Sequence, residues 1–412
     1  MKPTSLARLA FAASAALLAA CGGGGGGGGG SSGGGDPPAS TTQILVSAAS
    51  LDDLEQLCDD KGARVIGPVE GTSYYLVEIP DGVDADDFLE DMDDELEVED
   101  AEKDEGVGFP EGEGTTVPVF VDEGFDAITA QATLDAVGVP QARARGRRGA
   151  GVVVAVVDTG VDASSPALAG HLLPGFDFVD GDANPADVAN GADDDGDGAV
   201  DEGVGHGTFV ASLVLAVAPD ASILPVRALN SDAVGTASTV ARAIAWAVAN
   251  GADVVNLSAG LRVQLLSVQQ AIANAKNAGV PVVAAAGNRA LSTPDFPASA
   301  SDAFCVTSVT LARAKAPFAS WGSAVDLCTP GVDVLGAHPR SPTGLARWSG
   351  TSFSTAIVTG GFALLRGADG GASSESLLQR LESTSVDVDA VNPLHQGKLG
   401  EGMLDLDEAT AP

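Results

Sequence analysis

Uninterrupted apolar runs recur along the second half of the chain and predict the strands of a parallel sheet. Polar and apolar positions do not alternate within them, as they would in a strand with one face in water. A strand that helices cover on both faces has this pattern, because neither face is solvated. The runs occupy residues 152–157, 254–257, 280–286 and 305–309.

Helical spacing of apolar residues fills the intervals between these runs, at residues 208–215, 236–250 and 267–278. Gly251 and Gly279 directly follow the last two stretches, where a glycine commonly ends a helix. Strand and helix in alternation predict an α/β domain with a mainly parallel central sheet. Functional groups are then expected at the carboxyl ends of the strands.

A smaller pattern precedes this domain, in residues 41–103. Short strands and two helical stretches follow one another in the order β-α-β-β-α-β, which is the split βαβ plan of ferredoxin-like domains. Gly62 ends the first helical stretch, and the last strand is expected at 96–98. Residues 104–130 are rich in Gly, Glu and Pro, which is typical of a linker. The pattern therefore predicts a small α+β unit ahead of the α/β domain.

Residues 1–20 have the pattern of an export signal. Lys2 and Arg8 form a charged start, and the apolar run after them is short for a membrane span. The run ends in Leu-Ala-Ala before Cys21 and resembles a bacterial lipobox, in which this cysteine is lipidated. Residues 21–40 would then be the lipidated cysteine and a Gly/Ser-rich tether. The alternative is an ordinary secretory signal with a chance cysteine.

Composition limits the possible partners. The chain has 412 residues, 45% of them hydrophobic, which is enough for a sizeable core. A formal net charge of −36 argues against nucleic-acid binding, which needs a basic surface. Three cysteines remain besides Cys21, so at least one stays unpaired within the chain. Cys305 and Cys328 either form a disulfide or stay as two buried thiols.

The candidate chemistry centres on Ser352, in the run Gly-Thr-Ser-Phe-Ser-Thr-Ala at 350–356. A turn of small residues presents this serine, and the apolar run 356–365 predicts a helix behind it. A helix N-terminus offers free backbone N–H groups and a positive dipole end, which stabilise an oxyanion. A serine nucleophile also needs a base, an orienting carboxylate and a second oxyanion donor.

The chain supplies one strong candidate for each of these roles. His206 lies in a Gly-His-Gly-Thr motif, while Asp158 and Asn288 each follow an apolar run. Each residue alone would also suit a helix cap or a turn, so the hypothesis depends on the complete set. The other histidines lack the motif: His171, His338 and His395.

These motifs, in the order Asp, His, Asn, Ser, resemble those of the subtilisin-like serine peptidases (subtilases) over residues 131–412. The resemblance implies a three-layer α/β peptidase domain in which Asp158, His206 and Ser352 form the triad. It also implies that Asn288 donates to the oxyanion and that the chemistry needs no cofactor. The unit at 41–103 would be the pro-domain, an inhibitor and folding chaperone. An unrelated small α+β domain is the alternative.

The resemblance further implies two substrate-binding stretches, one that binds substrate backbone as an added strand and one that forms a wall of the specificity pocket. They are Ser258, Ala259 and Gly260 for the backbone, and Ala285, Ala286 and Gly287 for the pocket. Two positions depart from the family pattern. Phe209 replaces a frequent second histidine, and Ala356 replaces a usual proline. Neither is a catalytic group, so we expect activity to survive.

An acidic loop resembles a calcium site. Alternate carboxylates with a glycine for the sharp turn suit a hard cation. The acidic residue expected at the twelfth position is missing, and a neighbouring carboxylate would have to replace it. The candidate ligands are Asp193, Asp195, Asp197 and Asp201, with Val204 at the twelfth position and Glu202 as a further substitute. A solvated acidic loop is the alternative.

The sequence as a whole predicts an exported serine endopeptidase that is made as a self-processing zymogen. Its partners would be peptide or protein substrates, its own pro-domain and, through Cys21, a lipid membrane. It would be a cell-envelope lipoprotein or a secreted protein. The alternative is a catalytically inert subtilase-fold module for calcium-dependent peptide binding or adhesion.

Overall fold

The computed structural model describes residues 42–108 and 117–412. The predicted export signal, Cys21 and the whole of the predicted tether lie outside the described residues. The N-terminal part is a four-stranded antiparallel sheet, ordered β2-β3-β1-β4, with two helices. Its elements follow the predicted β-α-β-β-α-β order. They are β1 (Gln43–Ala48), α1 (Leu51–Lys61), β2 (Arg64–Pro68), β3 (Tyr74–Glu78), α2 (Ala85–Asp93) and β4 (Val98–Lys103).

Local signals set the helix ends in this part. Ser50 accepts the Asp53 N–H at the start of α1, and Gly62 ends the helix with a φ of 73°. The last strand begins at Val98 and runs to Lys103, so the prediction of 96–98 was wrong in its position. Leu96 is 99% exposed in the turn that precedes the strand, so its apolar side chain misled the prediction.

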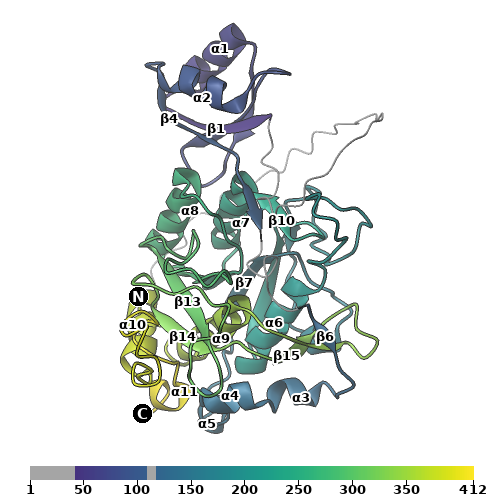
Figure 1. Ribbon diagram of the computed structural model, residues 1–412, viewed down its shortest axis with the longest axis vertical. Coiled ribbons are helices and arrows are strands. Elements are labelled where there is room, and N and C mark those ends of the chain that lie inside the picture. The colour runs from purple at the N-terminus through teal and green to yellow at the C-terminus, as the bar shows by residue number, and fades with distance from the viewer. Residues whose placement is uncertain (1–41, 109–116) are drawn as a thin grey trace, which may run out of the picture. The chain divides into compact units, whose positions relative to one another are not determined.

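A seven-stranded sheet forms the centre of the remaining chain, in the order β14-β13-β12-β11-β7-β9-β8. Figure 1 labels three of its strands, β7, β13 and β14. Every neighbouring pair in the sheet is parallel, which confirms the predicted α/β class. Its strands are β7 (Val153–Asp158), β8 (Phe176–Asp177), β9 (Ser222–Arg227), β11 (Val254–Leu257), β12 (Val282–Ala285), β13 (Ala303–Val309) and β14 (Leu327–Pro330).

Helices cover both faces of this sheet and give the three layers. The main ones are α6 (His206–Val217), α7 (Ala237–Ala249), α8 (Leu266–Asn277) and α9 (Thr351–Ala368). Val154 and Val156 of β7 pack in the cluster with α6 and α9, whereas Ala155 and Val157 pack with α7 and α8. Neither face of the strand meets water, which explains its uninterrupted apolar sequence.

Smaller elements complete the described chain. Two strands pair outside the main sheet, β5 (Gly106–Gly108) with β10 (Val234–Thr236). A three-stranded sheet contains β6 (Val119–Phe120), β15 (Val334–Ala337) and β16 (Leu345–Trp348). The short helices are α3 (Asp126–Thr129), α4 (Ala132–Ala136), α5 (Val139–Ala144), the 3-10 helix η2 (Pro166–Leu168), α10 (Ser374–Ser383) and α11 (Leu406–Ala409).

Two helices that carry candidate site residues begin earlier than predicted. Helix α9 starts at Thr351 rather than at 356, and α6 starts at His206 rather than at 208. The first turn of α9 consists of small residues and one phenylalanine and is buried throughout. Its weak helix propensity is outweighed by tertiary packing. Both Ser352 and His206 therefore lie inside first turns.

Cys58, Cys305 and Cys328 are buried free thiols in this structure. Of the two alternatives for Cys305 and Cys328, the structure therefore shows two buried thiols and no disulfide. Desolvation by burial raises the pKa of both, so they stay protonated at neutral pH. Across residues 42–108 and 117–412, no helix has the length and hydropathy of a membrane span.

Candidate active site

Asp158 and His206 meet at the carboxyl end of β7. Asp158 is the last residue of that strand, and His206 is the first residue of α6. The His206 Nδ1 lies 2.8 Å from the Asp158 Oδ1, and both side chains are fully buried. The Thr159 N–H donates to the same oxygen at 2.8 Å. An ionised carboxylate only accepts, so this contact selects the tautomer with the proton on Nδ1 and leaves Nε2 as the basic nitrogen.

Ser352 lies in the first turn of α9, next to this pair. Gly350 is the N-cap residue and adds no side-chain cap. The Ser352 Oγ is buried and has no hydrogen-bond partner within residues 42–108 and 117–412. The His206 ring centroid is 5.8 Å from that of Phe353, the residue after Ser352. Helices α6 and α9 pack in the same core cluster, so His206 and Ser352 lie in the first turns of two neighbouring helices.

Asn288 faces the same helix start. Its Oδ1 accepts the Thr351 N–H at 2.9 Å, which orients the amide group. The Asn288 Nδ2 is buried and has no acceptor in the part of the chain that the structure describes. The Gly287 N–H donates to the Thr351 Oγ1 at 3.1 Å and holds the preceding residue against α9. An oriented amide with a free N–H pair matches what an oxyanion donor requires.

The stretch predicted to bind substrate backbone pairs with a strand in this structure. The Gly260 N–H donates to the Gly108 carbonyl at 2.7 Å, and the Gly108 N–H donates to the Gly260 carbonyl at 3.2 Å. Gly108 is the last residue of β5. The edge at Ser258, Ala259 and Gly260 is therefore able to accept an antiparallel strand.

The sequence did not reveal one charged pair near both predicted substrate-binding stretches. The Asp295 carboxylate packs against two glycines, so that a Cβ on Gly287 would lie 2.0 Å from its Oδ2 and one on Gly260 would lie 3.4 Å away. Arg289 pairs with Asp295 at 2.5 Å. Asp295 is 7% exposed. In the sequence it follows a proline in a polar loop, where an aspartate is typical of an ordinary turn.

Several aromatic rings lie close to His206. Phe209, which departs from the family pattern, lies 4.5 Å from the Phe353 ring, and Trp348 lies 5.6 Å from His206. A second histidine, His338, lies 5.9 Å from Trp348. Burial, then the charges of Arg340 and His206, lower the pKa of His338 to about 4, so it stays neutral at neutral pH. No motif marked His338, because only the fold brings it here.

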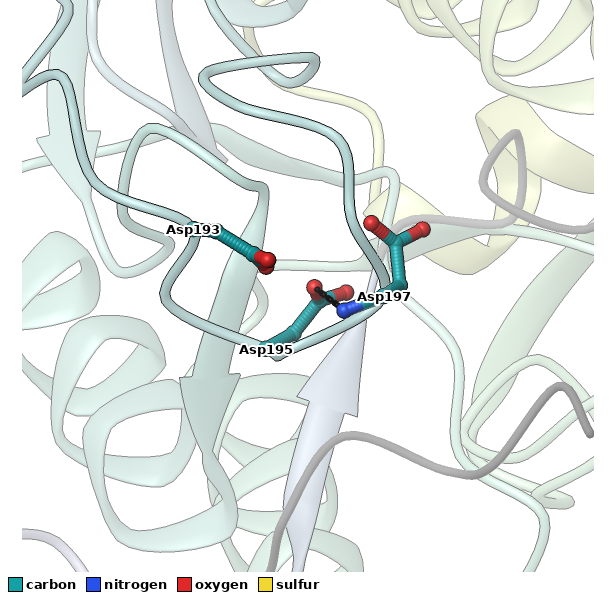
Figure 2. A group of neighbouring side chains, drawn as sticks. All are labelled: Asp193, Asp195 and Asp197. Atoms are coloured by element: carbon teal, nitrogen blue, oxygen red, sulfur yellow. Dashed lines mark hydrogen bonds between the residues drawn. The ribbon is translucent and has the colours of Figure 1, made fainter. Parts of the chain in front are cut away.

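Three of the four predicted metal ligands lie together. Figure 2 shows Asp193, Asp195 and Asp197 along one loop, and one carboxylate oxygen from each lies within 4.8 Å of the others. Burial and then the charges of its acidic neighbours, Asp197 first, raise the pKa of Asp195. Three oxygen donors at this spacing fit a hard cation. Asp201 is not in this group, and its carboxylate accepts the N–H groups of Asn190 and Gly191.

Known proteins are similar to this chain in sequence or in fold. Residues 149–402, more than half of the chain, match the model of the subtilase family, peptidase S8. Thermitase from Thermoactinomyces vulgaris is 38% identical over 247 residues, which are 58% of this chain and 82% of thermitase. Subtilisin BL from Lederbergia lenta is 32% identical over 283 residues, which are 66% of this chain and 96% of that protein.

A solved structure shows the same fold. Fervidolysin from Fervidobacterium pennivorans, described as a keratinolytic enzyme related to subtilisin, aligns with a TM-score of 0.75 at 21% identity. The alignment covers 93% of this chain and 62% of fervidolysin, so this chain spans less than two thirds of that protein. At this identity the likeness concerns the fold. Together with the family match and the two relatives, it shows that the chain belongs to the subtilase family of serine endopeptidases.

Proposed function

We propose that this protein hydrolyses peptide bonds with Asp158, His206 and Ser352 as the triad and Asn288 as an oxyanion donor. The observation that carries the proposal is the buried 2.8 Å contact between Asp158 and His206, at the start of the helix that packs on α9. The oriented amide of Asn288 supports it. A binding module would have no need for a buried histidine–carboxylate pair, which costs desolvation.

The roles follow from the positions of these groups. Ser352 attacks the peptide carbonyl while the Nε2 of His206 takes its proton, and the imidazolium then gives that proton to the leaving amine. Asp158 keeps the proton on Nδ1 and stabilises the imidazolium. The Asn288 amide and the Ser352 N–H at the start of α9 receive the oxyanion, and each lowers the barrier by about 3 kcal/mol. Water then releases the acyl group by the same steps.

A fluorophosphonate probe distinguishes this proposal from an inert subtilase-fold module. The probe reacts with a serine that a neighbouring base activates. We expect stoichiometric labelling of purified protein, with the modified peptide containing Ser352. A protein that folds, shows no labelling and cleaves no peptide would support the inert module instead.

The structure also supports a zymogen with residues 41–103 as the pro-domain. The Glu102 carboxylate accepts the Leu266 and Ser267 N–H groups at the start of α8, at 2.7 and 3.0 Å. Asp104 accepts the N–H and the hydroxyl of Ser238 at the start of α7. Strand β5 follows directly and occupies the substrate-binding edge at Gly260. A segment in that place would exclude substrate until it is cleaved and released.

The acidic loop is proposed to hold a structural calcium ion, which takes no part in the chemistry. Calcium should raise the melting temperature of the Ser352→Ala protein, because bound cation relieves repulsion among Asp193, Asp195 and Asp197. At a calcium concentration of about 100 Kd the gain is about 2.7 kcal/mol. Replacing both Asp195 and Asp197 with alanine should remove most of it. The measurement is a melting curve with calcium and with chelator.

The inactive background excludes self-digestion as a cause of any difference between these curves. Alanine at both Asp59 and Asp60, which are exposed on helix α1, is the matched control that removes two other carboxylates. That control should keep the full calcium response. Coincident curves for the parent protein would identify the loop as a solvated acidic surface.

Cys21 is proposed to carry a lipid that anchors the exported protein. Replacing Cys21 with serine should move the protein from the membrane fraction to the soluble fraction or leave the signal uncleaved, because the lipid attaches through the thiol. Fractionation and intact mass measure this outcome. An unchanged distribution, with no lipid mass on the parent protein, would favour an ordinary secretory signal.

A further inference from the structure

Helix α6, which begins at His206, receives its N-terminal cap from a distant residue. Its own N-cap, Gly205, has a φ of 100° and no side chain. The Asp187 carboxylate instead accepts the Gly205 N–H at 2.9 Å and the Thr208 N–H at 3.2 Å. It also accepts the Thr208 hydroxyl at 2.6 Å. A carboxylate here satisfies orphan donors and complements the helix dipole on both sides of His206.

The same carboxylate is tied to the strand end that carries Asp158. The Thr159 hydroxyl donates to the Asp187 Oδ1 at 3.2 Å and accepts the Gly207 N–H at 3.0 Å. The Thr159 N–H donates to the Asp158 Oδ1, the oxygen that contacts His206. One buried carboxylate thus connects the two elements whose separation sets the Asp158–His206 distance.

The charge of Asp187 lies near the base as well. Asp187 is 3% exposed. Burial, and to a lesser degree the charge of Asp158, raise the pKa of Asp187 to about 6, against the four hydrogen bonds that favour the ionised form. A buried negative charge beside His206 favours the imidazolium that forms in the transition state.

We infer that Asp187 is a positioning residue that holds His206 against Asp158 and supports its protonated form. The inference rests on the proposed function, because it assigns His206 as the base. Asp187 itself touches neither substrate nor the reacting atoms. Its removal should therefore affect the proton-transfer step while leaving substrate binding largely unchanged.

The charged and titratable groups around His206 determine how kcat/KM should depend on pH. Asp158 faces its Nδ1, Asp187 lies behind the helix start, and His338 with Arg340 approaches from the segment between β15 and β16. His338 stays neutral down to about pH 4. The acid limb of kcat/KM in the parent enzyme therefore reports the protonation of His206 beside Asp187. Without the charge of Asp187, the His206 imidazolium is less stable, so the acid limb of kcat/KM should move to lower pH.

The test is Asp187→Asn in the full-length chain, with active sites counted by fluorophosphonate labelling. We expect kcat to fall about 10- to 100-fold, because a small displacement of the base has effects of this size. KM should stay within about twofold, and the acid limb should shift to lower pH. The matched control is Asp326→Asn, because Asp326 also accepts a backbone N–H and burial raises its pKa to about 7. Asp326 directly precedes β14, at the amino end of the parallel sheet, whereas Asp158 lies at the carboxyl end. The control should keep the parent kcat and acid limb.

Thr208→Val provides a second variant in case Asp187→Asn does not fold. It removes the 2.6 Å hydroxyl bond to Asp187, and Thr208→Ser should restore activity because it returns that hydroxyl. Parental kcat and acid limb in Asp187→Asn, or in Thr208→Val where only that variant folds, would overturn the inference. The inference would also be overturned if Asp326→Asn lowered kcat as much as Asp187→Asn does and the acid limb of kcat/KM moved in neither variant. A parent protein that neither labels nor cleaves peptide would refute the proposed function instead.

Discussion

Ser352→Ala is expected to abolish peptide hydrolysis and leave the fold intact. The hydroxyl alone attacks the carbonyl, and its Oγ bonds to no described residue, so the substitution breaks no hydrogen bond in the resting protein. The size of the loss, about 10⁶-fold in kcat, is the known cost of removing the nucleophile of subtilisin, a member of the same family. Peptide cleavage and fluorophosphonate labelling measure it.

Circular dichroism and the melting temperature of the variant provide the control for folding. Ser354→Ala is the matched serine variant, two residues further along the same buried turn, where the hydroxyl bonds to Ser308 and to the Thr329 carbonyl. It should cost stability while the protein still labels. Substantial hydrolysis by purified Ser352→Ala would remove Ser352 from the triad.

Asn288→Ala is expected to lower kcat about 100- to 1,000-fold with little change in KM. The amide meets a full negative charge only in the transition state, so its loss does not weaken ground-state binding. This magnitude is the known effect of the corresponding asparagine in subtilisin. Steady-state kinetics on a single peptide substrate measure both parameters.

Asn288→Asp sharpens this test. The aspartate keeps an oxygen for the Thr351 N–H, which Asn288 Oδ1 accepts at 2.9 Å, but replaces the free N–H donor with a second acceptor. It should therefore lose at least as much kcat as alanine while the helix start stays in place. A change confined to KM in either variant would show that Asn288 binds substrate rather than the oxyanion.

The strand predictions succeeded where burial on both faces leaves a clear pattern. The run at 152–157 became β7, and Asp158 ends that strand as the parallel-sheet rule requires. The helix starts were less accurate. Apolar periodicity begins after Ser352, whereas α9 begins at Thr351, because tertiary packing rather than propensity stabilises its first turn.

The candidate residues that the sequence missed have no local signature. Asp187 precedes His206 by 19 positions and caps its helix only because the loop between them folds back onto α6. Asp295 lies in a polar loop and packs against Gly260 and Gly287. His338 comes beside the aromatic rings around His206 through the strand pair β15 and β16. Spacing along the chain carries no information on such contacts.

Sequence patterns were sufficient to identify the α/β class, the family and the four residues of the proposed chemistry. These properties depend on short motifs and on hydrophobic periodicity, both of which are local. The folded structure was needed to establish how Asp158 and His206 meet, which groups surround them, and that Cys305 and Cys328 remain separate thiols. Those outcomes depend on packing between elements distant in the chain, where the burial of each side chain is set by neighbours that no local pattern identifies.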